Sequence, residues 1–178
     1  MRLVVELPTP ADTERLGRAV GERLQPGDLV VLSGPVGAGK TVLARGIAAG
    51  LGVRGPITSP TFVIAREHPP LPGGRGVPLV HADAYRLGAL AELDDLDLDT
   101  DLLNAAVVVE WGEGMAERLA PEHLLIRLHR SLAGDADQRR LALLQGPSRL
   151  VPSRLVPPGA PVTAGPVGGC GRADTPGR

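Results

Sequence analysis

The sequence predicts a three-layer α/β fold, with a mainly parallel central sheet and antiparallel strands at its edges. The segments 29–33 ("LVVLS") and 105–111 ("AAVVVEW") are continuous apolar runs, which are typical of parallel strands buried on both faces. The runs 123–130 and 139–145 are joined by a short segment containing Gly and Asp, which favour turns and predict a strand pair. A length of 178 residues allows one ordinary domain with a proper core.

The first two elements are a short strand over 3–7 and a helix over 9–24. Thr9 is the predicted N-cap, Pro10 occupies the first helical position, and Asp12 lies in the first turn. Apolar residues at helical spacing give this helix one face for packing: Leu16, Ala19, Val20 and Leu24.

The strand 29–33 leads into a glycine-rich loop and a second helix, which is expected to begin near Lys40 and to stop at Gly52. An alternating stretch within 57–68 and a strand over 77–85 are predicted to form a wide hairpin. The remaining elements are expected, in order, as a helical or mixed segment over 88–103, the strand 105–111, a short helix over 113–120, and the strands 123–130 and 139–145.

The composition changes after residue 145. Residues 146–178 contain seven Pro and seven Gly, a density of helix and sheet breakers that is typical of disordered segments. We therefore predict one domain over 1–145, followed by a disordered tail over 146–178.

Charge and cysteine content narrow the class of protein. The formal net charge is −1, so the chain has no overall basic field to hold nucleic acid without help. The single Cys170 excludes an internal disulfide framework and fits a reducing compartment. No stretch approaches the ~20 apolar residues of a membrane span. We expect a cytoplasmic protein without a membrane partner.

The segment "GPVGAGKT" fits the phosphate-binding pattern G-x-x-x-x-G-K-[ST] and lies between a buried strand and a helix, as that pattern requires. Its glycines allow backbone N–H groups to converge on a phosphate, and the following helix adds the positive end of its dipole. The chain is thus predicted to have a P-loop NTPase fold and to bind the phosphates of a nucleotide through Gly34, Pro35, Val36, Gly37, Ala38, Gly39, Lys40, Thr41 and Val42.

Lys40 is the only lysine in the chain, and all the other residues that make up its Lys and Arg total of 19 are arginine. A compact ammonium fits a tight anion cradle better than a planar guanidinium, which is wider and presents its donors as a fork. We therefore expect Lys40 to reach the β- and γ-phosphates of the nucleotide. Thr41 is placed to give its hydroxyl to Mg²⁺.

Hydrolysis of a nucleoside triphosphate also needs a carboxylate near the magnesium. Glu110 follows the apolar run "AAVVV", and Asp83 follows the more mixed strand "VPLVHA". Octahedral magnesium keeps some of its waters, so we expect one carboxylate to bind the ion directly and the other through water, and the sequence leaves open which does so. The predicted metal ligands are Thr41, Asp83 and Glu110.

Four segments together resemble the TsaE family, formerly YjeE. They are "GPVGAGKT" (34–41), "TSPTF" (58–62), "HADAYRL" (81–87) and "VVVEWGE" (107–113), and the resemblance covers roughly residues 3–145. The three aromatic residues of the chain, Phe62, Tyr85 and Trp111, each fall in one of the last three segments.

The resemblance implies a function. It implies an ATPase, weak alone, that works with the proteins TsaB and TsaD in threonylcarbamoyl-adenosine modification of tRNA next to the anticodon. Its hydrolysis of ATP would support turnover of that complex, and tRNA would be contacted only indirectly, through the complex. The implied catalytic residues are Lys40, Asp83, Glu110 and Thr61, with Thr61 in a loop of the switch type.

Two other functions remain open. Many P-loop proteins of similar size are small-molecule kinases, although the chain has no clear acceptor-binding region or arginine-bearing lid. A nucleotide-gated binding module with incidental hydrolysis is the other alternative. The roles of Trp111 and Tyr85 stay open between packing, a partner contact and shaping of the nucleotide site. Arg86 is either a surface ion-pair residue or an arginine finger acting in cis.

Overall fold

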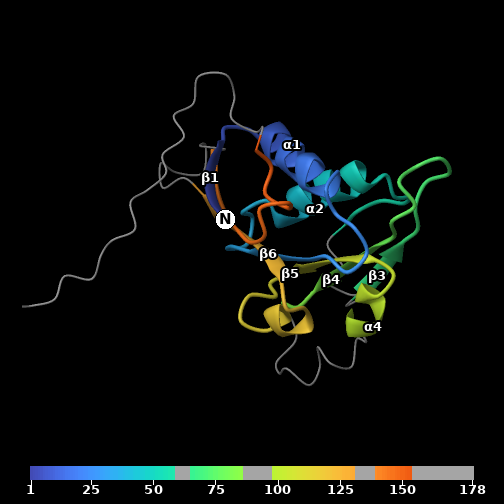
Figure 1. The fold of residues 1–178 in the computed structure, drawn as a ribbon. Coiled ribbons are helices and arrows are strands. Elements are labelled where there is room, and N and C mark those ends of the chain that lie inside the picture. The colour runs from blue at the N-terminus through green and yellow to red at the C-terminus, as the bar shows by residue number, and fades with distance from the viewer. Residues whose placement is uncertain (59–64, 86–97, 131–138, 154–178) are drawn as a thin grey trace, which may run out of the picture.

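The computed structural model describes residues 1–58, 65–85, 98–130 and 139–153 (Figure 1). Within these ranges the strands form one seven-stranded sheet of order β1-β7-β6-β2-β5-β4-β3. The strands are β1 (Arg2–Leu7), β2 (Leu29–Ser33), β3 (Ala65–His68), β4 (Leu79–Asp83), β5 (Ala106–Glu110), β6 (His123–Arg130) and β7 (Arg140–Gln145). The helices are α1 (Pro10–Gly21), α2 (Lys40–Leu51), α4 (Leu98–Leu102) and the 3₁₀ helix η1 (Ala116–Leu119).

The centre of the sheet is parallel, as predicted. β2 pairs in parallel with β5 on one side and with β6 on the other, and β4 pairs in parallel with β5. The edge pairs β3–β4, β6–β7 and β1–β7 are antiparallel, which confirms the two predicted strand pairs. Every residue of β4 and β5 is buried. β2, the strand before the glycine-rich loop, lies in the interior of the sheet, because it has β5 on one edge and β6 on the other.

Helices cover both faces of the sheet and complete the three predicted layers (Figure 1). α1 and α2 pack together over one face, and their side chains share a core cluster with β1, β2, β6 and β7. α4 and η1 contribute to a second cluster on the opposite face. The cores are built from Leu, Val, Ile and Ala, in agreement with the low aromatic content.

Close contact between α1 and α2 fixes the position of the second helix. A Cβ on Gly17 would lie 2.3 Å from the Leu43 carbonyl oxygen, and a Cβ on Gly46 would lie 2.2 Å from that of Glu14. Any side chain at either glycine would therefore force the helices apart. Because α2 begins directly after the glycine-rich loop, this contact also holds the loop against α1.

Four strands differ from their predicted bounds by one or two residues at an end, and three helical segments differ more. The short helix expected over 113–120 is a single 3₁₀ turn, since Gly112 and Gly114 precede it and Pro121 follows it. The segment expected over 88–103 contains α4 at its end, and its remaining part lies outside the described residues. α1 ends at Gly21, three residues before the predicted end.

The packed chain continues beyond residue 145, where the sequence predicted the domain to end. Leu150 and Val151 are buried in the core under α1 and α2. Arg149 makes two hydrogen bonds to the buried Asp28 carboxylate, at 2.6 and 2.9 Å. The rest of the predicted tail, 154–178, lies outside the described residues. No helix in the described ranges is long and apolar enough to cross a membrane.

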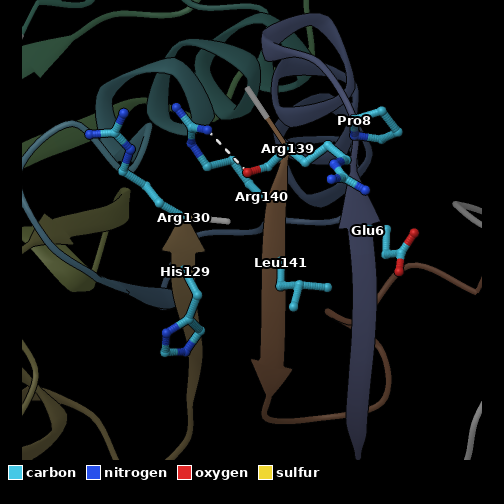
Figure 2. A pocket seen from close by; sticks show the side chains of 7 residues that line it. All are labelled: Glu6, Pro8, His129, Arg130, Arg139, Arg140 and Leu141. Carbon is cyan, nitrogen blue, oxygen red and sulfur yellow. Dashed lines mark hydrogen bonds between the residues drawn. The ribbon is translucent and has the colours of Figure 1, made fainter. Parts of the chain in front are cut away.

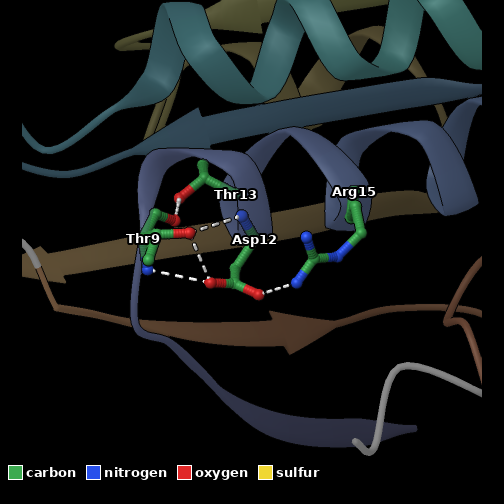
Figure 3. A network of polar contacts seen from close by, with 4 residues as sticks. All are labelled: Thr9, Asp12, Thr13 and Arg15. Atoms are coloured by element: carbon green, nitrogen blue, oxygen red, sulfur yellow. Dashed lines mark hydrogen bonds and ion pairs between the residues drawn. The ribbon is translucent and has the colours of Figure 1, made fainter.

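A capping box begins α1, as the sequence indicates (Figure 3). The Thr9 hydroxyl oxygen accepts a hydrogen bond from the Asp12 N–H, and the Asp12 carboxylate accepts from the Thr9 N–H at 2.9 Å. The Thr9 hydroxyl also donates to this carboxylate, at 2.6 Å, and Arg15 pairs with it. The Thr9 hydrogen bond is the main cause that lowers the pKa of Asp12, and partial burial opposes it.

Thr9→Ala is expected to lower the free energy of unfolding by about 1 kcal/mol near neutral pH, because helix N–H groups lose their cap. The lowered pKa of Asp12 means that its stabilising contribution is present above its ordinary value of 3.8 and is lost as pH falls through the folded-state value. The difference in free energy of unfolding between wild type and variant should therefore shrink in acid. Urea denaturation at neutral pH and at a pH below the folded-state pKa of Asp12 measures this difference. Arg15→Ala, which removes only an exposed ion pair, should cost less than about 0.5 kcal/mol; equal losses for both variants would contradict this account.

Candidate functional site

The glycine-rich loop connects β2 to α2 at the carboxyl edge of the parallel strands. Gly34, Gly37 and Gly39 have φ angles of 139°, 75° and 103°, in the region that L side chains rarely adopt. A Cβ on Gly34 would also lie 2.4 Å from the Leu128 carbonyl oxygen. These positions accept only glycine without strain, and the loop keeps its backbone exposed as a concave surface of the kind that binds anions.

Lys40 crosses the loop from the first turn of α2. Its Nζ donates hydrogen bonds to the carbonyl oxygens of Gly34, at 2.8 Å, and Pro35, at 3.1 Å. The residue is only 5% exposed. Burial lowers the pKa of Lys40, while the Glu110 and Asp83 carboxylates raise it in part. The ammonium is therefore held in place before any phosphate arrives.

Trp111 forms a wall of the site directly after β5. Its φ angle of 61° is positive, which is unusual for a bulky residue and indicates a position that the surrounding structure imposes. Lys40 Nζ lies 3.6 Å from the centre of the Trp111 ring, a cation–π distance. The Tyr85 ring is tilted by 51° against Trp111, with centroids 4.9 Å apart. Of the roles left open for these two residues, the structure thus favours shaping of this site.

The two predicted carboxylates lie side by side at the ends of β4 and β5, where Asp83 and Glu110 are register partners. Both are buried, at 6% and 2% exposure. The Thr41 hydroxyl donates to the Glu110 carboxylate, with distances of 3.2 and 3.3 Å to its two oxygens. One Asp83 oxygen accepts from the Tyr85 N–H at 2.9 Å. Glu110 is therefore the carboxylate in contact with Thr41.

A cavity of about 310 Å³ lies over the loop, with residues from β4, β5, the loop and α2 as its walls: Val36, Gly37, Gly39, Lys40, Asp83, Tyr85, Glu110 and Trp111. It combines a backbone cradle, a buried ammonium and two carboxylates, a donor set that fits a phosphate chain with a divalent cation. Among the described residues no group of three or more His, Cys, Asp and Glu side chains is placed to hold a metal by itself. A cation here would need phosphate oxygens and water to complete its ligands.

The structure brings most of the predicted site residues together. Gly34 and Pro35 hold Lys40 through their carbonyl groups, Ala38 is buried within the loop, and Thr41 and Val42 are half-buried in the first turn of α2. Thr61, the predicted switch-loop residue, and Arg86 lie outside the described residues.

His81 is a further residue of the site, which the sequence motifs above did not single out. Its side chain is 1% exposed, and its Nε2 lies 3.0 Å from Glu110 Oε1. An ionised carboxylate only accepts hydrogen bonds, so Nε2 carries the proton in this contact. The available signal was the position of His81 two residues before Asp83 on one strand, which places both side chains on the same face.

His81→Ala is expected to lower the free energy of unfolding by about 1–3 kcal/mol, because it leaves a buried carboxylate oxygen without a partner. His81→Gln retains an N–H donor of similar reach and should recover part of the loss. Denaturant unfolding of the two variants checks this. Equal stability of the Ala and Gln variants would show that the hydrogen bond to Glu110 contributes nothing.

Comparisons with known proteins show what the whole chain is similar to. The family model "Threonylcarbamoyl adenosine biosynthesis protein TsaE" matches residues 7–141. The chain is 60% identical over 130 residues to a tRNA threonylcarbamoyladenosine biosynthesis protein TsaE from Mycobacterium bovis, covering 70% of this chain and 77% of that protein. It is 55% identical to the protein of that name from Streptomyces coelicolor, covering 74% and 88%. A crystal structure of YdiB from Bacillus subtilis is similar, with a TM-score of 0.64, 28% identity, and coverage of 82% of this chain and 86% of that one.

Proposed function

The chain belongs to the TsaE family of tRNA threonylcarbamoyladenosine biosynthesis proteins, and within that role we propose that it is a magnesium-dependent ATPase. One observation carries the proposal. The buried ammonium of Lys40 and the Thr41–Glu110 pair meet over a glycine cradle whose backbone faces the cavity. This combination has the parts that binding and hydrolysis of a nucleoside triphosphate require.

The loop and Lys40 bind the phosphate chain. Backbone N–H groups of the loop and of the first turn of α2 donate to phosphate oxygens, helped by the dipole of α2. Lys40 exchanges its two carbonyl partners and the Trp111 ring for the more strongly charged β- and γ-phosphates. Because the ammonium already lies over the loop, this exchange needs only a short movement of its end.

Thr41 and Glu110 hold the cation, since their oxygens already lie within hydrogen-bond distance of each other. Asp83, with one oxygen committed to the Tyr85 N–H, acts through a water molecule. Bound magnesium supplies positive charge to the phosphate oxygens during transfer. His81 keeps the Glu110 carboxylate oriented toward Thr41. Thr61 remains the proposed sensor of the γ-phosphate.

The partners proposed here are those that the resemblance to the family implies. We propose that the chain acts with TsaB and TsaD, that its hydrolysis of ATP resets their complex between turnovers, and that it contacts tRNA only through them. The low net charge of −1 supports indirect contact with RNA, because the chain has no overall basic field to hold it.

The test is ATP hydrolysis by the full chain, measured alone, with TsaB and TsaD, and with small phosphate acceptors. The proposal expects slow hydrolysis alone, acceleration by TsaB–TsaD and no phosphorylated acceptor. Phosphate transfer to an acceptor would favour a kinase. ATP binding with unchanged hydrolysis in the complex would favour a nucleotide-gated binding module.

A further inference from the structure

The turn after β5 holds Trp111 in a conformation that is costly for a bulky residue, with a φ angle of 61°. Such a conformation persists only where the surrounding structure fixes the chain. Before the turn, the Trp111 N–H donates to the Leu32 carbonyl oxygen of β2 at 2.9 Å. After it, Gly112 is buried so closely that a Cβ there would lie 2.8 Å from side-chain atoms of both Val109 and Ala116. The backbone is therefore held on either side of Trp111.

Glu113 anchors this turn to the neighbouring strands. Its Oε1 accepts a hydrogen bond from Arg127 Nε of β6 at 2.7 Å, and Arg127 Nη2 lies 2.5 Å from the same oxygen. Arg127 Nη1 also donates to the side-chain oxygen of Gln145 on β7. The hydrogen bond from Arg127 is the main cause that lowers the pKa of Glu113, and a hydrogen bond from the Ser33 side chain adds to it. The Glu113–Arg127 pair therefore joins the turn to β2, β6 and β7.

The pair lies where the glycine-rich loop begins. Ser33 is the register partner of Arg127 and the last residue of β2, and Gly34 follows it. The carbonyl oxygen of Leu128, the residue after Arg127, lies 2.4 Å from the point where a Cβ on Gly34 would stand. The residues that line the nucleotide cavity include Trp111 but neither member of the pair. The pair can thus act on the site through the turn that carries Trp111.

The loop is also held from the side of β7 (Figure 2). Arg140 Nε, at the start of β7, donates to the Ala38 carbonyl oxygen at 3.2 Å. Figure 2 shows the Arg140 side chain beside that of Arg130, at the ends of β6 and β7. The contact between Arg140 and Ala38 does not involve Trp111. Loss of the Glu113–Arg127 pair should therefore leave this contact in place and release mainly the turn after β5.

We propose that Glu113 and Arg127 are positioning residues of the nucleotide site, which keep the Trp111 ring against the Lys40 ammonium. This inference rests on the proposed binding of ATP by the loop. Lys40 Nζ lies 3.6 Å from the centre of the Trp111 ring, and a group that is already ordered binds its ligand at a lower entropic cost. An ion pair whose side chains are 30% and 32% exposed contributes little to stability. The role of the pair is therefore the position of the turn.

The first measurement is the fluorescence of Trp111, the single tryptophan, in the full-length chain without nucleotide. Glu113→Ala and Arg127→Met should each shift its emission to longer wavelength and increase its quenching by acrylamide, because the ring becomes more accessible to water. The double variant should behave as either single variant does, since each change removes the same pair. Glu113→Gln retains an acceptor oxygen for Arg127 and should lie closer to wild type.

Arg149→Ala is the matched control. It removes two hydrogen bonds to the buried Asp28 carboxylate, which directly precedes β2 at the end of the strand opposite to Ser33. The control should lower the midpoint of denaturant unfolding more than the Glu113 and Arg127 variants do, because it leaves a buried carboxylate without that partner. It should nevertheless leave the emission of Trp111 unchanged.

The second measurement is calorimetric titration, in magnesium, with a non-hydrolysable ATP analogue. Glu113→Ala and Arg127→Met should each weaken binding by roughly threefold to tenfold, the effect of losing one cation–π contact. Arg149→Ala should bind the analogue as wild type does.

Three results would overturn the positioning role. They are wild-type emission of Trp111 in both Glu113→Ala and Arg127→Met, an equal shift of the emission in Arg149→Ala, and unchanged affinity for the analogue in variants whose emission has shifted. Failure of the wild-type chain to bind the analogue would instead overturn the proposed ATPase function. The emission measured without nucleotide would still decide whether the pair positions Trp111.

Discussion

Lys40→Arg is expected to lower the affinity for ATP with magnesium by on the order of 100-fold, although it keeps the positive charge. Each hydrogen bond from a charged donor contributes roughly 1.5–3 kcal/mol, and the ammonium is placed to make two. The Lys40 end lies between the Gly34 and Pro35 carbonyl oxygens and the Trp111 ring, 3.6 Å away. A guanidinium is too wide for that space and would have to leave the loop.

Calorimetry and the fluorescence of Trp111, the single tryptophan, measure this loss directly. Lys40→Met is the matched comparison, because it keeps a long flexible side chain without charge. Both variants should bind equally poorly while keeping the wild-type circular dichroism spectrum. If the arginine variant binds ATP as wild type does, shape does not matter at this position and the account of the loop is wrong.

Glu110→Gln is expected to reduce ATP hydrolysis in the TsaB–TsaD complex by on the order of 10²- to 10³-fold, the usual cost of losing one preorganised charged or polar group from an active site. The amide preserves the shape of a side chain that is 2% exposed, but it carries no negative charge for the cation beside Thr41. Nucleotide binding measured without magnesium should be retained, since the loop and Lys40 are unchanged.

Asp83→Asn should have a smaller effect than Glu110→Gln, because we place Asp83 one water molecule away from the cation. Glu67→Gln, on the exposed side of β3, is the control and should hydrolyse ATP normally. Steady-state phosphate release over a range of magnesium concentrations distinguishes the variants. A larger loss for Asp83→Asn would reverse the two assignments, and full activity of Glu110→Gln would remove Glu110 from the mechanism.

The local patterns predicted the secondary structure well wherever one element has a single strong signal. β2 and β6 begin and end at the predicted residues, because their apolar runs are bounded by clear breakers. The fold class followed from the two fully apolar strands, and the sheet and its neighbour structure confirm it. Weaker signals gave less accurate predictions. Gly112 and Gly114 precede a single 3₁₀ turn where a short helix was expected. The Pro-rich composition after 145 predicted disorder, although Leu150 and Val151 are buried.

By itself the sequence determined that there is a glycine-rich loop of the phosphate-binding type, that Lys40 is the cation within it, and that Asp83 and Glu110 each end a predicted strand. These features are local, since glycine, proline and apolar runs constrain the backbone within a few residues. Only the tertiary structure decided that Glu110 meets Thr41, 69 positions away, that Trp111 lies against Lys40, and that Arg140 contacts the loop through the Ala38 carbonyl oxygen. Such contacts depend on which strands become neighbours. Strand order is set by the packing of the whole core, which no short segment encodes.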